Sequence, residues 1–233
     1  MRNSDIFLQD FNKLENYLKE KESMEFWISF SQLISRISKK NPEIRKYESK
    51  LKQYGNLRNA IVHDEKFKQR VIAEPHKDIV EELKVIIKKV MEPKKVIPMF
   101  KSKVLAFQAE DSIEKIIKIM YEKSFSQVPI YINSNFEFLL TSNTITRWIG
   151  SKSNDEIFDF NENRVEELKD FEEETKNFLF INRDINIYEV IEKFNSVEFP
   201  KLEALLITNS GKKHEKLLGI ITYADLPKLI KEL

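Results

Sequence analysis

A repeated order of elements in the second half of the chain constrains the fold more than any other feature. From residue 104 onward, a short run of β-forming residues precedes an amphipathic helix, and two further strand-like runs and a last helix follow. The runs VLAF, QVPIYI and FEFLLT of the first copy correspond to FLFI, EALLIT and LLGIIT of the second. Self-similarity of this kind predicts two related folded units in tandem. We therefore expect β-α-β-β-α repeats at residues 99–150 and 177–233.

The first 92 residues have a different periodicity. They contain one glycine and two prolines, and between these lie four segments with the apolar spacing of amphipathic helices. Pro42 suits a first helical position, and Asn41 before it suits a helix cap. Helices joined by short turns predict a bundle over residues 1–92. The fold class is thus α+β and multidomain, with an N-terminal four-helix bundle followed by the two repeats.

Two further segments separate these units. The stretch EPKKVIPMF interrupts the helical pattern with two prolines, so we place a linker at residues 93–98. Residues 151–176 are dominated by charged side chains. A charge-rich segment of this type is usually exposed, and we expect a solvated helix or loop there.

Composition limits the classes of function. The 39 basic and 38 acidic residues leave a net charge of +1, without the overall basic excess typical of nucleic-acid-binding proteins. The absence of cysteine excludes disulfides and thiolate metal sites, and the histidine spacing supports no metal site either. There is no signal-peptide pattern and no apolar run long enough to span a membrane. We expect a cytoplasmic protein that does not enter a membrane, and the Lys, Ile, Asn and Glu bias is typical of AT-rich bacterial genomes.

The end of the second repeat carries a candidate binding motif, Gly-x-x-Thr-x-x-Asp, at Gly219, Thr222 and Asp225. A carboxylate in the first turn of a helix can accept hydrogen bonds from both vicinal hydroxyls of a ribose, and the amides at a helix start suit a phosphate. The alternative is structural, because Thr222 and Asp225 are also good helix-capping residues. This motif, the tandem repeats and the segment SFSQVPIY of the first repeat resemble the CBS domain pair, or Bateman module.

The resemblance implies a regulatory adenine nucleotide (AMP, ATP or a related compound) as ligand, with no required cofactor and no metal. It places the adenosine-containing ligand in a cleft to which both repeats contribute. The residues implied are Gly219, Thr222 and Asp225 of the second repeat and Ser126, Gln127 and Pro129 of the first.

The first repeat departs from this pattern. It keeps Thr141 but has Phe138 in the position of the glycine and Thr144 in the position of the aspartate. A threonine hydroxyl cannot replace the two-oxygen grip of a carboxylate on a diol. We therefore expect one good adenosine site per chain, at Asp225.

A polar trio interrupts an apolar helical segment of the bundle, LRNAIVH, with Arg58, Asn59 and His63. Histidine can move a proton near neutral pH, arginine can neutralise a phosphate, and asparagine can position either group. On a regular helix, residues five apart point about 140° apart. One shared site therefore requires that the helix bends or ends near His63, or that a two-fold dimer brings two copies together. Alternatively, Arg58 and His63 are exposed residues of a bundle helix.

The Arg-Asn-x-x-x-His pattern on a helical bundle resembles HEPN domains. This resemblance implies a homodimeric, metal-independent endoribonuclease that acts on RNA, with Arg58, Asn59 and His63 as catalytic residues. The leading hypothesis is a CBS pair that senses an adenine nucleotide and regulates such a nuclease, in stress response or phage defence. The alternative is a non-catalytic nucleotide sensor whose bundle is a dimerisation or protein-docking module.

Overall fold

The computed structural model describes residues 1–22, 28–62, 73–153, 160, 163–173 and 175–233. By its internal contacts the chain divides into two units. The first comprises Met1–Lys94 together with Asn186–Glu192, and the second comprises Lys95–Ile185 together with Lys193–Leu233. Within the described residues, no helix is both long and apolar enough to cross a membrane.

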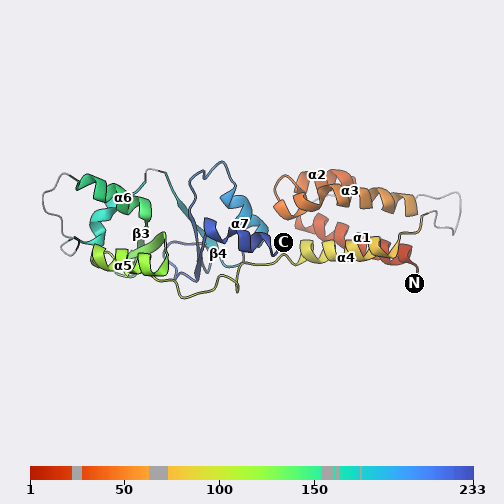
Figure 1. Ribbon diagram of the computed structural model, residues 1–233. Coiled ribbons are helices and arrows are strands. Elements are labelled where there is room, and N and C mark those ends of the chain that lie inside the picture. The colour runs from red at the N-terminus through yellow and green to blue at the C-terminus, as the bar shows by residue number, and fades with distance from the viewer. Residues whose placement is uncertain (23–27, 63–72, 154–159, 161–162, 174) are drawn as a thin grey trace. The chain divides into compact units, whose positions relative to one another are not determined.

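In the described part of residues 1–94, unit 1 has four helices, which Figure 1 shows in red to yellow. Their buried side chains form one apolar core. The helices are α1 (Asn3–Lys21), α2 (Phe30–Ile37), α3 (Pro42–Val62) and α4 (Lys77–Met91). Each helix buries one face, and the fully buried side chains include Phe7, Leu14, Leu33, Leu51 and Leu83. The N-terminal helical region expected from the apolar periodicity is therefore present.

The starts of the helices follow from local capping residues. α3 begins at Pro42, and the Ile44 amide donates to Oδ1 of Asn41 at 3.0 Å, as expected for a cap. α2 begins later than its apolar pattern suggests, because Ser29 caps it by accepting from the amide of Gln32. In the sequence, the apolar helical spacing of this segment begins at residue 24. Residues 24–27 lie outside the described part of the chain.

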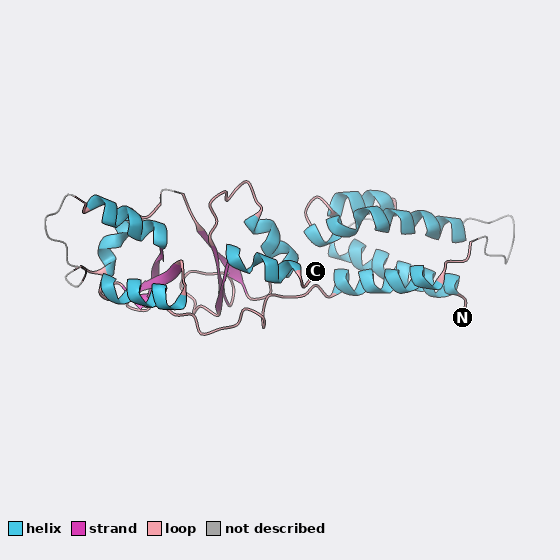
Figure 2. Ribbon diagram, viewed as in Figure 1, coloured by secondary structure: helices cyan, strands magenta, loops and turns pink. Residues whose placement is uncertain are grey.

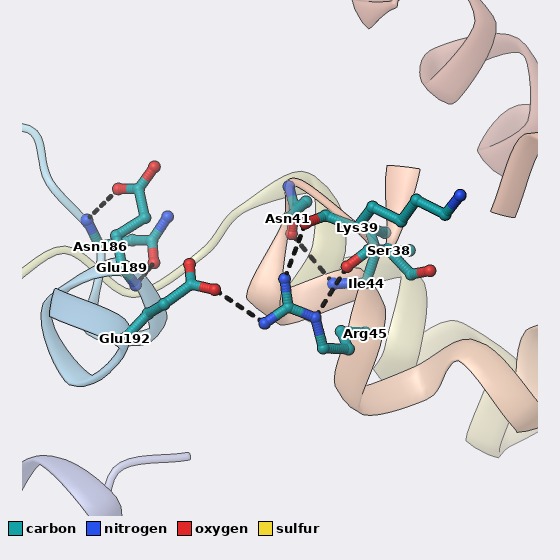
Figure 3. A network of polar contacts seen from close by, with 8 residues as sticks. All are labelled: Ser38, Lys39, Asn41, Ile44, Arg45, Asn186, Glu189 and Glu192. Carbon is teal, nitrogen blue, oxygen red and sulfur yellow. Dashed lines mark hydrogen bonds and ion pairs between the residues drawn. The ribbon is translucent and has the colours of Figure 1, made fainter. Parts of the chain in front are cut away.

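An arginine on α3 fixes the connection between α2 and α3 (Figure 3). Arg45 donates from Nε to the carbonyl of Ser38 at 2.8 Å and from Nη2 to that of Lys39 at 3.0 Å. Its Nη1 pairs at 2.7 Å with Glu192, in the part of α7 (Ile187–Phe194) that belongs to unit 1. The guanidinium thereby satisfies carbonyls at the end of α2 that have no partner within the helix.

The strands that the structure describes all lie in unit 2 and are magenta in Figure 2. They form two three-stranded sheets of the same topology. In each sheet the first strand is parallel to the second, and the second is antiparallel to the third. The first sheet consists of β1 (Phe107–Gln108), β2 (Gln127–Ile132) and β3 (Asn135–Thr141), and the second of β4 (Phe178–Asn182), β5 (Ala204–Thr208) and β6 (Gly219–Thr222). The remaining helices are α5 (Ile113–Lys123), α6 (Ser142–Ser151) and α8 (Leu226–Ile230). The repeated strand–helix units expected from the sequence are thus observed, with β1 shorter than the VLAF run.

Part of the charged segment between the repeats is not solvated, contrary to expectation. The 3₁₀-helix η1 (Val165–Phe171) places Val165 and Leu168, which are three residues apart, in the core of the first sheet. Both side chains are fully buried. The Val165 amide donates to the carbonyl of Asp111 at 3.1 Å, which pins the segment to the start of α5. Two apolar residues at helical spacing outweigh the charge of their neighbours.

Candidate functional site

The turn after β6 holds the motif threonine and aspartate together. Oδ2 of Asp225 accepts from the Thr222 amide at 2.8 Å and from the Thr222 hydroxyl at 3.1 Å. Both side chains are half-buried, and the turn continues through η2 (Tyr223–Asp225) into α8. The carboxylate therefore does cap this turn, but the two bonds use one of its two oxygens.

The equivalent turn after β3 has the opposite polarity, and its second threonine, Thr144, is buried. Here the Thr141 hydroxyl accepts from the Thr144 amide at 3.1 Å, and the two threonine hydroxyls are 3.0 Å apart. Thr141 and Thr144 are each only 1% exposed. A ribose cannot reach Thr144, whose amide and hydroxyl are both engaged by the Thr141 hydroxyl. Thr141, Ser142 and Asn143 line the larger of the two cavities described below.

A cavity of about 430 Å³ lies beside the Asp225 turn, within unit 2. Its lining brings together five of the six residues implied by the sequence: Ser126, Gln127, Pro129, Thr222 and Asp225. Gln127 and Pro129 lie at the start of β2, Ser126 directly precedes it, and Thr222 and Asp225 belong to the second repeat's motif. Gln127 also reaches the other repeat directly, with Nε2 at 3.4 Å from the carbonyl of Glu203.

The lining residues that the sequence did not indicate include Phe100, Lys103 and Lys228. Nζ of Lys228 lies 4.9 Å from the centre of the Phe100 ring, which holds the ammonium group at the cavity wall. Lys228 follows Asp225 by three residues, so helical spacing alone could have indicated it. No local sequence pattern indicates that Phe100 or Lys103 lines the cavity, because their position depends on the path of the chain after the linker.

Gly219, the sixth implied residue, does not line this cavity. A Cβ added there would lie 1.9 Å from the carbonyl oxygen of Phe100. The Ser102 amide donates to the carbonyl of Leu218 at 3.1 Å and holds the same segment against β6. Gly219 is therefore required for the close approach of the segment that forms one wall of the cavity.

A larger cavity of about 830 Å³ adjoins the first and shares Ser126, Gln127, Thr222 and Ala224 with it. Its charged lining consists of two glutamates and one lysine, Glu173, Glu203 and Lys201, whereas the 430 Å³ cavity has two lysines and one aspartate. Burial, and then the nearby Glu173 carboxylate, raise the pKa of Glu203. A phosphate is therefore better matched by the smaller cavity than by the larger one.

In the bundle, Arg58 and Asn59 lie next to each other near the end of α3, with Nη1 of Arg58 at 3.2 Å from Oδ1 of Asn59. Both line a cavity of about 310 Å³ in unit 1. Nε of Arg58 is buried, and among the described residues it has no hydrogen-bond partner. His63, the third residue of the trio, lies outside the described residues, so its expected approach to Arg58 stays a prediction.

Comparison with known proteins assigns the C-terminal part. Residues 168–232 match the family model of the CBS domain. Comparison with curated protein sequences gave no match.

Similar solved structures include a protein with CBS domains from Burkholderia ambifaria, with 18% identity, a TM-score of 0.42, and coverage of 56% of this chain and 84% of that one. A CBS domain pair in complex with 5′-methylthioadenosine and S-adenosyl-L-methionine has 16% identity, a TM-score of 0.44, and coverage of 60% and 98%. CBSX2 in complex with AMP has 12% identity, a TM-score of 0.44, and coverage of 60% and 97%. From its match to the family model, the C-terminal part of this chain, over residues 168–232, is a CBS domain.

Proposed function

We propose that this protein is a regulatory sensor that binds one adenine nucleotide per chain, in the 430 Å³ cavity at Asp225. The observation that carries the proposal is the contrast between the two motif turns. Asp225 is half-buried at a cavity and uses one oxygen for the turn, whereas Thr144 is sealed in the core. One open and one closed turn support a single site.

Each part of a nucleotide has a counterpart in the cavity lining. The carboxylate of Asp225 accepts hydrogen bonds from the ribose hydroxyls, as ionised carboxylates do strongly. Lys103 and Lys228 supply positive charge for the phosphate. The apolar side chains of Val104, Leu105 and Ile220 offer a surface for the adenine ring.

Titration calorimetry of the full chain with AMP and with ATP tests this proposal. We expect one site per chain, and a loss of affinity of about tenfold or more in Asp225→Ala, because each hydrogen bond to a charged group contributes about 1.5–3 kcal/mol. Two equal sites per chain, or binding unchanged in Asp225→Ala, would contradict it.

For the output of the sensor, we propose that the bundle at residues 1–92 is a HEPN-like, metal-independent endoribonuclease that works as a homodimer and is regulated by the nucleotide. The supporting observation is that Arg58 lines a cavity instead of tying two helix ends together. Its Nε is buried and has no hydrogen-bond partner among the described residues. Arg58 neutralises the scissile phosphate, His63 transfers the proton, and Asn59 positions Arg58. A ligand regulates this activity only if its affinity differs between two arrangements of the dimer.

Incubation with mixed RNA in EDTA, with and without AMP, ATP or cyclic oligoadenylates, tests the nuclease. We expect cleavage that leaves cyclic phosphate ends and that is lost in His63→Ala and in Arg58→Ala. Cleavage that survives His63→Ala, or no cleavage under any ligand, removes the nuclease. The bundle is then a dimerisation or docking module, an alternative that the near balance of 39 basic and 38 acidic residues favours.

A further inference from the structure

The residues of helix α7 (Ile187–Phe194) are divided between the two units. Those up to Glu192 group with unit 1 by their internal contacts, and the last two, Lys193 and Phe194, group with unit 2. In the sequence, α7 is the first helix of the second repeat, whose motif turn carries Asp225. A helix of this length spans about 12 Å and behaves as a rigid element. A displacement at one end of α7 therefore reaches the other end.

The start of α7 is fixed by backbone hydrogen bonds. The amide of Asn186 donates to Oε2 of Glu189, and the amide of Glu189 donates to Oδ1 of Asn186, both at 3.0 Å (Figure 3). The amide of Ile187 donates to the carbonyl of Lys94 at 3.0 Å. These bonds cap the first turn and attach it to the last residue of the first segment of unit 1.

Side chains on one face of α7 contact the start of α3. Tyr188 and Glu192 lie four residues apart and therefore on the same face. Nη1 of Arg45 pairs with Oε1 of Glu192 at 2.7 Å (Figure 3). Nζ of Lys46 lies 5.7 Å from the centre of the Tyr188 ring, which is buried. Burial, and then a hydrogen bond with Tyr47, raise the pKa of Tyr188, so its hydroxyl stays neutral. α7 is thus held on α3 by contacts on two successive turns.

The last residue of α7 contacts the motif turn of unit 2. The rings of Phe194 and Tyr223 lie 6.1 Å apart in an edge-to-face arrangement, with an interplanar angle of 84°. Phe194 is buried, whereas Tyr223 is 61% exposed. Tyr223 lies between Thr222 and Asp225, whose two hydrogen bonds hold the turn together. The ring contact therefore joins the end of α7 to the turn that carries Asp225.

We propose that α7 couples the ligand site at Asp225 to the start of α3 in the bundle. The inference rests on the proposed nucleotide site and names the element through which that site regulates the bundle. A ligand that binds Asp225 holds the turn in one position, and Tyr223 moves with the turn. Phe194 passes this displacement to α7, which carries it to Arg45. Coupling of this kind is reciprocal, so a change at Glu192 alters the affinity for the ligand.

Titration calorimetry of the full chain with AMP tests the coupling from α3 to the ligand site. The double variant Tyr188→Phe, Glu192→Gln removes two polar contacts with α3 and changes no residue that lines the 430 Å³ cavity. We expect it to change AMP affinity by about threefold or more. The matched control is Tyr121→Phe, Glu198→Gln, at an exposed tyrosine of α5 and an exposed glutamate after α7, and it should leave the affinity unchanged. Equal affinity of the parent and the α7 variant overturns the inference.

Hydrogen exchange without ligand tests the coupling in the opposite direction. Tyr223→Ala removes the ring contact with Phe194, and we expect the amides of residues 42–50 to exchange about twofold faster or more. Tyr121→Ala, at a tyrosine that is 85% exposed, is the control and should leave this exchange unchanged. Unchanged exchange of residues 42–50 in Tyr223→Ala overturns the inference. If the parent does not bind AMP, the proposed sensor site fails, and hydrogen exchange alone decides whether α7 couples the turn to α3.

Discussion

The two strand-to-helix turns of unit 2 have the same position in the same topology and opposite chemical character. After β3, a threonine caps the turn and its partner Thr144 is buried. After β6, an aspartate caps the turn from the helix side and stays half-exposed at a cavity. The turns differ at the residue three positions after the threonine, which is Thr144 in the first turn and Asp225 in the second. Turns at the same position of a repeated fold can therefore differ in whether the capping aspartate or threonine faces a cavity or is buried.

The comparison also shows that the structural and the binding interpretations of the motif are compatible. Asp225 caps the turn with Oδ2, and a carboxylate has a second oxygen available. In the first repeat, the same capping need is met by a neutral hydroxyl. Capping is common to both turns, so it cannot explain why the second turn has an aspartate.

The largest effects on the free energy of unfolding are expected for substitutions at Gly219 of the second repeat and at Phe138, which has the same position in the first repeat. Gly219→Ala forces the Phe100 carbonyl away from β6, and we expect a loss of about 2–3 kcal/mol in the free energy of unfolding. Phe138 fills the core of the first sheet, so Phe138→Ala should cost about 3–5 kcal/mol by leaving a cavity. Urea unfolding measures both. A neutral effect of Gly219→Ala would contradict the close approach.

The second prediction concerns affinity at the two turns. Asp225→Asn keeps the shape of the side chain and removes its charge, so AMP affinity should fall about tenfold or more. Thr144→Val changes the equivalent position in the closed turn and should leave AMP affinity within about twofold. Calorimetry compares them, with urea unfolding as the check on folding. Equal losses in both variants would mean that the turns are not distinct.

A third prediction contrasts half-buried Asp225 with a fully buried carboxylate. Glu43 on α3 is 2% exposed, and burial raises its pKa to about 8, a shift that Lys21 opposes and Glu189 reinforces. The folded state keeps this proton up to about pH 8, whereas the unfolded state loses it near pH 4.5. The free energy of unfolding should therefore fall as pH rises from about 4.5 to 8 and stay low above that.

Glu43→Gln removes this dependence. We expect it to raise the free energy of unfolding by about 1–3 kcal/mol at pH 7 and to change little at pH 4. Glu20→Gln, at an exposed position of α1, should have no comparable effect at either pH. Urea unfolding at pH 4 and pH 7 measures these changes. If Glu43→Gln changed the free energy of unfolding equally at both pH values, this would contradict a buried, protonated carboxyl.

The smallest effect is expected at the rim of the Asp225 cavity. Lys228 is exposed, so solvent screens its charge. Lys228→Gln should weaken the binding of AMP by about two- to fivefold and should leave the binding of adenosine almost unchanged. Lys231→Gln, at an exposed residue outside the cavity lining, is the control. An equal loss of affinity for AMP and for adenosine would mean that Lys228 does not face the phosphate.

Sequence reasoning was most successful where periodicity and local capping determine the structure. The four bundle helices, the cap at Asn41 and the repeated strand order all follow from short-range patterns. Five of the six implied residues line one cavity because the repeat places the β2 start and the β6 turn together. The role of Asp225 in binding remains a prediction.

The features that were missed depend on contacts between distant segments. Phe100 and Lys103 reach the cavity because the chain after the linker passes β6 at Gly219, and no local pattern encodes that path. Val165 and Leu168 look like minor interruptions in a charged segment, yet they complete the core of the first sheet. The pairing of Lys19 with Glu15 and of Lys52 with Glu48 likewise requires three-dimensional positions to be known.

The sealed Thr141–Thr144 turn has a consequence for how such a sensor would respond to concentration. With the single site per chain that we propose, a chain has no second ligand through which occupancy could be reinforced. Its saturation would follow a simple hyperbola, with about an 80-fold range of free ligand between 10% and 90% occupancy. A sensor of this kind would report the nucleotide level in a graded manner, and any steeper threshold would have to come from assembly of chains.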